Sequence, residues 1–96
     1  MNEQYLVIIQ GFIAYWNLNR QTATLLATAL MALARNKSAE NSGKATGILM
    51  AYNAAGMIDE NTYQEGYNLV ANAIMNTKTE REAVDAIYNY FDECDH

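Results

Sequence analysis

Side chains that could perform covalent chemistry are few in this sequence. A nucleophilic mechanism needs a Ser, Cys or Thr beside a base, but the single cysteine, Cys94, and the single histidine, His96, both lie in the last three residues. A catalytic geometry is hard to maintain there because chain ends fray. The paired carboxylates Glu80 and Glu82 lie at a helix start that favours their charged form, so they are poor general acids. We therefore expect a protein that is not an enzyme.

Motifs for metals and nucleotides are incomplete. Residues 92–96 include possible metal ligands, but a frayed segment gives poor geometry and favours adventitious binding only. Residues 42–47 superficially resemble a phosphate loop, yet the earlier glycine and the Ser or Thr after the lysine are missing. Residues 56–59 resemble half of a calcium loop whose first and last positions would be Ala51 and Thr62, neither of which anchors calcium. We expect no cofactor and no metal.

Charge is distributed unevenly along the 96 residues. Residues 1–58 contain four basic and two acidic residues, a net charge of +2, whereas residues 59–96 contain two basic and nine acidic residues, a net charge of −7. A surface that tracks nucleic-acid phosphates needs clustered Lys and Arg, so direct nucleic-acid binding is disfavoured. A basic protein surface is the partner that this charge favours.

Two rows of polar residues are candidates for binding that partner. In a helix over residues 80–93 the acids form one outer stripe, and those near its end oppose the helix dipole and repel one another. In a helix over residues 60–75, asparagines form a line despite their poor helix propensity. Solubility alone explains many such faces and stays the alternative. The predicted partner-binding residues are Glu65, Asn68, Asn72, Glu82, Asp85, Asn89, Asp92 and Glu93.

The densest apolar run spans residues 5–16 and covers about half of a helical wheel. This width predicts a central helix around which the others pack, with Gly11 allowing close approach of another helix. The run is too short to cross a membrane, and Gln10 and Asn17 interrupt it. Because aromatic residues dominate interface cores, the alternative hypothesis is a structural or regulatory homo-oligomer. Its predicted interface residues are Tyr5, Phe12, Tyr15 and Trp16.

Composition predicts an all-α fold. Proline is absent, and Ala, Leu, Met, Gln and Glu favour helix. The length corresponds to one domain. We expect a compact bundle of about five short helices around the hydrophobic N-terminal helix. The predicted helices cover residues 3–16, 20–35, 44–55, 60–75 and 80–93.

Local signals support these boundaries. Asn19 and Asp59 are predicted N-caps, and Thr79 with Glu82 has the spacing of a capping box. Gly56 is suited to the left-handed conformation after a helix end, and residues 36–43 are predicted to form the one real loop. In the second helix we expect a buried face that includes Leu25 and an outer face that includes Met31, and in the fifth we expect Tyr90 on the inner face.

The function that these features favour is that of a small acidic protein-binding module. It would inhibit or modulate a host protein with a basic surface, such as a nuclease or another nucleic-acid-processing complex, and its size and charge fit a phage or mobile-element product. The single thiol and Glu3, where a leader would carry Lys or Arg, indicate a reducing cytoplasm. An enzyme is the third and most distant reading.

Overall fold

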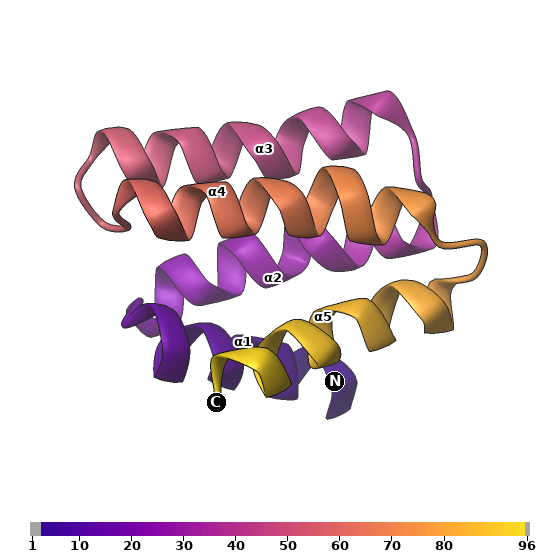
Figure 1. The fold of residues 1–96 in the computed structure, drawn as a ribbon, viewed down its shortest axis with the longest axis horizontal. Coiled ribbons are helices and arrows are strands. Elements are labelled where there is room, and N and C mark those ends of the chain that lie inside the picture. The colour runs from indigo at the N-terminus through magenta and orange to yellow at the C-terminus, as the bar shows by residue number, and fades with distance from the viewer. Residues whose placement is uncertain (1–2, 96) are drawn as a thin grey trace.

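Helices account for nearly all of residues 3–95, the part of the chain that the computed structural model describes, and no strand lies within that range (Figure 1). The predicted all-α bundle is confirmed. The predicted fourth helix is one continuous helical segment made of an α-helix, a π-helix and a 3-10 turn. The elements are α1 (Glu3–Trp16), α2 (Arg20–Arg35), α3 (Ala39–Ala54), α4 (Glu60–Asn68), η1 (Leu69–Ala73), η2 (Ile74–Asn76) and α5 (Glu80–Cys94).

The predicted caps are present at the starts of α2 and α4. The Asn19 side chain accepts the Thr22 backbone N–H at 2.8 Å, and the Asp59 carboxylate accepts the Thr62 backbone N–H at 2.8 Å. The hydrogen bond from the Thr62 backbone holds the pKa of Asp59 below its usual value. Gly56, after α3, adopts a φ of 76°, as predicted for a helix end. Short polar side chains therefore define these boundaries locally.

The prediction for the start of α3 is wrong by five residues. The expected loop over residues 36–43 is only a short joint, because Ser38 caps a helix that begins at Ala39. The Ser38 hydroxyl accepts the Asn41 backbone N–H at 3.1 Å, and the Asn41 side chain donates to the Asn36 carbonyl at 2.9 Å. Polar residues typical of turns thus form the cap and first turns of α3.

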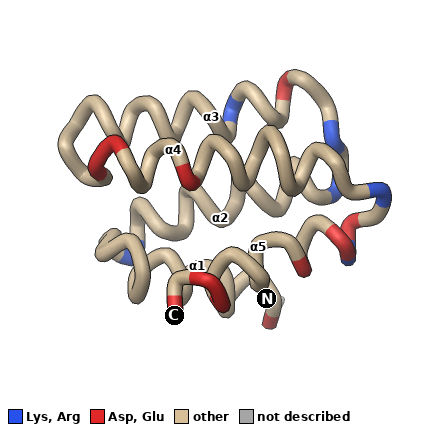
Figure 2. The backbone as a smooth tube through the Cα atoms, in the orientation of Figure 1, with Lys and Arg blue, Asp and Glu red and all other residues tan. Residues whose placement is uncertain are grey.

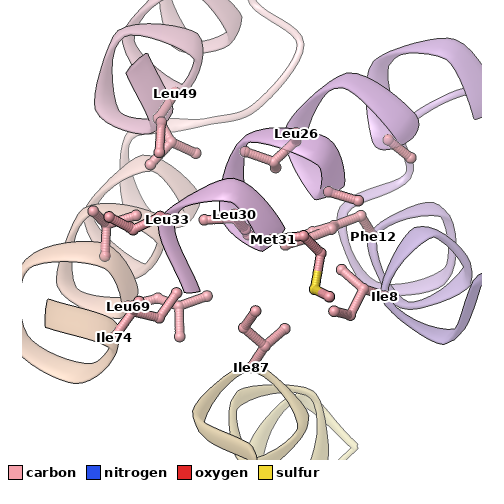
Figure 3. Close-up of a cluster of buried hydrophobic side chains, with 14 of the residues drawn as sticks. Ile8, Phe12, Leu26, Leu30, Met31, Leu33, Leu49, Leu69, Ile74 and Ile87 are labelled. Atoms are coloured by element: carbon pink, nitrogen blue, oxygen red, sulfur yellow. The ribbon is translucent and has the colours of Figure 1, made fainter. Parts of the chain in front are cut away.

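The core is a single cluster to which every helix contributes (Figure 3). Helix α2 lies in the middle of the bundle, packing against α1, α3 and α5 (Figure 1). The N-terminal helix α1 packs mainly on α2 and α5, so α2 takes the central position that the sequence assigned to residues 3–16. Side chains that converge in Figure 3 include Ile8, Phe12, Leu26, Leu30, Leu33, Leu49, Leu69, Ile74 and Ile87.

The buried arc of α2 is rotated from the predicted face. Leu25 is 54% exposed, whereas Met31 is only 4% exposed. The reason is that α2 contacts helices on several sides, and its small residues Ala23, Ala27 and Ala34 are buried where those helices approach closely.

Candidate partner-binding groove

A groove of about 820 Å³ runs between the segment α4–η1 and the helix α5. The C-terminal end of α1 contributes two aromatic residues to its lining. Polar and apolar side chains both line it, as in many binding sites. The lining residues are Tyr15, Trp16, Thr62, Glu65, Asn68, Leu69, Ala73, Ala86, Asn89, Tyr90, Glu93 and Cys94.

Four of the eight predicted partner-binding residues line this groove. Glu65 and Asn68 come from α4, and Asn89 and Glu93 come from α5, so each helix supplies one carboxylate and one amide. All four side chains are exposed. None of the described residues that line the groove is Lys or Arg. The groove therefore carries negative charge on both walls.

Asn72 belongs to the same asparagine row but does not line the groove. Its side-chain amide donates to the Asn68 Oδ1 at 3.0 Å, and the Asn76 amide donates to the Asn72 carbonyl at 2.8 Å. Asn72 thus orients Asn68, which is the member of the row that faces the groove.

Glu82 lies outside the groove, and one of its carboxylate oxygens caps the start of α5. Its Oε1 accepts the backbone N–H groups of Thr79 at 3.1 Å and Lys78 at 3.2 Å, while the Thr79 hydroxyl accepts the Glu82 backbone N–H at 3.1 Å. The predicted capping box is confirmed. Glu82 therefore has a structural role at the start of α5, and its role in partner binding stays a prediction.

Asp85 and Asp92 are exposed but lie outside the groove. Burial raises the pKa of the Tyr88 hydroxyl, and the negative charges of Asp85 and Glu3 raise it further. The residues of the predicted acid stripe therefore lie on two sides of α5. Asn89 and Glu93 face the groove, whereas Asp85 and Asp92 do not.

Two of the four predicted oligomer-interface residues are buried within the chain's own core. Phe12 is 0% exposed and Trp16 is 7% exposed, so neither side chain is accessible to a second copy in the folded protein. Tyr5 is partly buried and shares a hydrogen bond with Thr28. Tyr15 is exposed, and its hydroxyl donates to Asp95 at 3.0 Å. The homo-oligomer stays a prediction, without Phe12 and Trp16 as anchors.

A hydrogen-bond relay that the sequence did not indicate connects three residues of the groove lining. The Trp16 Nε1–H donates to the Tyr90 hydroxyl oxygen at 2.8 Å, and the Tyr90 hydroxyl donates to the Glu65 Oε1 at 2.6 Å. Burial, followed by the hydrogen bond to Glu65, raises the pKa of Tyr90 far above its usual value, so the hydroxyl keeps its proton. Periodicity assigned Tyr90 to the inner face and gave no sign of partners 25 and 74 residues away.

The π-helix η1 forms part of the same wall. Leu69 and Ala73, its first and last residues, line the groove, while Leu69 and Val70 also reach the core. A π turn adds a residue to the helical turn, and such insertions are frequent at functional sites. Here it lets one short helical segment serve both the core and the groove.

Most lysines and arginines gather at one end of the molecule (Figure 2). Blue segments lie where α2 finishes, α3 begins and the connection to α5 runs, with red segments among them, and a further blue segment lies near the start of α2 at the opposite end. Two ion pairs within residues 3–95, Arg35 with Glu80 and Lys44 with Glu40, connect charges in that basic end. The carboxylates that line the groove have no such partner among the described residues.

Within residues 3–95, no three His, Cys, Asp or Glu side chains are close enough to hold a metal ion. His96, which the sequence analysis considered with 92–95, lies outside the described residues. None of the described helices is long and apolar enough to span a membrane. No protein-family model, curated protein or solved structure matches this chain.

Proposed function

We propose that the protein is a binding module that holds a basic helical segment of a partner protein in the groove between α4–η1 and α5. The observation that carries this proposal is the lining of the groove, in which Glu65 and Glu93 stand on opposite walls and no lysine or arginine is present. A cationic partner would pair with both walls at once.

The shape of the groove favours a helix as the occupant. The lined stretch from Thr62 to Ala73 is about 16 Å long at the helical rise, which corresponds to about three turns of a bound helix. Because both walls are helical, a third amphipathic helix can pack between them through ridges and grooves. Its apolar face would contact Leu69, Ala73 and Ala86, and its basic residues would reach the carboxylates.

Inhibition or modulation of a nucleic-acid-processing protein follows from that mode of binding. A basic segment that binds nucleic acid presents clustered Lys and Arg to phosphates. An acidic groove that occupies the same residues would compete with the nucleic acid. In this proposal the protein acts by occupying a surface and performs no bond chemistry.

The single tryptophan provides a direct test. Trp16 lines the groove, so its fluorescence reports on the site. The probe is a tryptophan-free amphipathic peptide of about 16 residues, rich in Arg, Ala and Leu, a length at which helices become stable in isolation. We expect saturable changes in Trp16 emission and an affinity that falls between about 50 and 300 mM NaCl.

Matched charge variants test where the peptide binds. Glu65→Gln with Glu93→Gln removes two charges from the groove, whereas Asp85→Asn with Asp92→Asn removes two charges outside it. We expect the first pair to weaken binding by about tenfold or more, as the loss of charge-assisted contacts predicts, and the second pair to change it little. Equal weakening by both pairs would mean a diffuse acidic surface instead of the groove.

A further inference from the structure

Glu65 differs from Glu93, the other carboxylate in the groove lining, because a hydrogen bond from Tyr90 orients it. An indole N–H can only donate a hydrogen bond, so the Tyr90 oxygen must accept from Trp16 and must direct its own proton elsewhere. That proton goes to the Glu65 Oε1 at 2.6 Å. Trp16 thus donates to Tyr90, and Tyr90 donates to the Glu65 carboxylate, which is held by this bond although its side chain is exposed.

The relay leaves one oxygen of Glu65 for a ligand. Oε1 accepts from Tyr90, and Oε2 accepts no hydrogen bond from the described residues. The rings of Trp16 and Tyr90 meet edge to face, with centroids 6.1 Å apart, and both line the groove with Tyr15. A carboxylate oriented by a hydrogen bond thus stands beside the ring of Tyr90, which in turn contacts Trp16.

This combination suits a guanidinium group better than an ammonium group. Guanidinium is planar, presents N–H donors in a rigid fork, and stacks on aromatic rings. An ammonium group is a strongly hydrated point charge that gains little from a carboxylate held in one orientation. The Asn68 and Asn89 side-chain oxygens can accept the remaining N–H donors of an arginine.

Building on the proposed function, we infer that the groove selects arginine over lysine in the bound segment, and that Tyr90 is the positioning residue for this selectivity. Tyr90 acts through Glu65, which makes the direct contact. Glu93, on the opposite wall, attracts either cation and supplies affinity without discrimination.

Two peptides of identical length and charge test the inference. One is the arginine peptide described above, and the other carries lysine at every arginine position. Titrations that follow Trp16 fluorescence are made with the wild-type protein at one salt concentration. We expect the arginine peptide to bind about tenfold more tightly, the scale of one charge-assisted hydrogen bond.

Variants of the relay then test whether Tyr90 and Glu65 cause the preference for the arginine peptide. Tyr90→Phe keeps the ring and removes the hydroxyl, so we expect the two peptides to bind with similar affinity and the salt dependence to persist. Glu65→Asp keeps the charge but shortens the side chain by one methylene, so we expect it to reduce the ratio of the two peptide affinities as well. It provides the test if Tyr90→Phe does not fold. Tyr67→Phe is the matched control, because Tyr67 lies on α4 outside the groove lining and should leave the ratio unchanged. Circular dichroism checks that each variant is folded.

The outcomes separate this inference from the proposed function. Failure of both peptides to bind the wild-type protein would overturn the proposed function and the inference with it. Equal, salt-dependent binding of both peptides, lost in Glu65→Gln with Glu93→Gln, would overturn the inference alone. A ratio preserved in both folded relay variants would also overturn it, because selectivity would then not depend on the orientation of Glu65.

Discussion

Gly11 determines how closely α5 packs against α1. A Cβ atom at this position would lie 2.3 Å from the Phe91 ring. The ring has little freedom to move, since it packs edge to face against Phe12 at 5.0 Å and stacks on Tyr15 at 5.7 Å. The close approach predicted at Gly11 is thus made by an aromatic residue of α5. The same aromatic group supports Tyr15 at the groove, so one glycine connects core packing with the candidate site.

We expect Gly11→Ala to lower the free energy of unfolding by about 1–3 kcal/mol, the usual range for overpacking a core. Gly47→Ala is the control, because an added Cβ there meets nothing within 4 Å and lies inside α3. Alanine should raise the stability at that position by about 0.5–1 kcal/mol through helix propensity. Urea unfolding followed by circular dichroism measures both variants. Equal stability of Gly11→Ala and the wild type would show that Phe91 can move aside.

Among the helices, α5 shows how one element combines three tasks. Its start is fixed by the capping box of Thr79 and Glu82, its inner face packs Ala83, Val84, Ile87 and Phe91, and its groove face presents Asn89 and Glu93. The acids at its C-terminal end oppose the helix dipole, whereas those in its first turn are stabilised by it. The acids in the first turn of α5 therefore have a structural role, whereas the binding role proposed for Glu93 does not depend on the helix start.

This division predicts different effects for two neighbouring acids of α5. Glu82→Ala removes the acceptor for two backbone N–H groups, so we expect it to lower the free energy of unfolding by about 0.5–2 kcal/mol. Asp85→Ala, one turn later and exposed, should change it by less than about 0.5 kcal/mol. Thermal denaturation compares them. Equal losses would mean that the capping box contributes nothing to stability.

Across the full bundle, the same aromatic residues serve the core and the groove. Trp16 packs edge to face against Phe12 at 4.7 Å and donates to Tyr90 at the groove. The core thus extends to the candidate site without a flexible lid or loop between them. Binding to such a site requires little reorganisation of the protein, and preorganisation reduces the cost of association.

The buried position of Trp16 predicts the result of removing it. Trp16→Ala should lower the free energy of unfolding by about 3–5 kcal/mol, which is a large part of the stability of a small domain. Val7→Ala, on the same helix and 50% exposed, is the control and should stay within about 0.5 kcal/mol of the wild type. Circular dichroism and light scattering measure folding and mass. A dimeric wild type with a folded, monomeric Trp16→Ala variant would restore the oligomer interface predicted from the sequence.

Much of the fold could be predicted from the sequence because its causes are local. Helix propensity, the absence of proline and the caps at Asn19, Asp59 and Thr79 act over a few residues, and they define most helix boundaries. Ser38 carries a comparable signal but was masked by its turn-forming neighbours. The acidic character of the second half of the chain is equally a property of composition.

The site could be predicted only in part, because it depends on contacts between distant residues. Glu65, Asn68, Asn89 and Glu93 share a groove only because η1 and η2 pack on α5 and bring α4 opposite it. Periodicity gives a face for each helix without saying which neighbour covers it. For the same reason Phe12 and Trp16 are apolar enough for an interface but are buried in the core, and Tyr90 gains its role from partners on two other helices. Local chemistry determined where the helices begin and end, and packing between the helices determined which side chains come into contact.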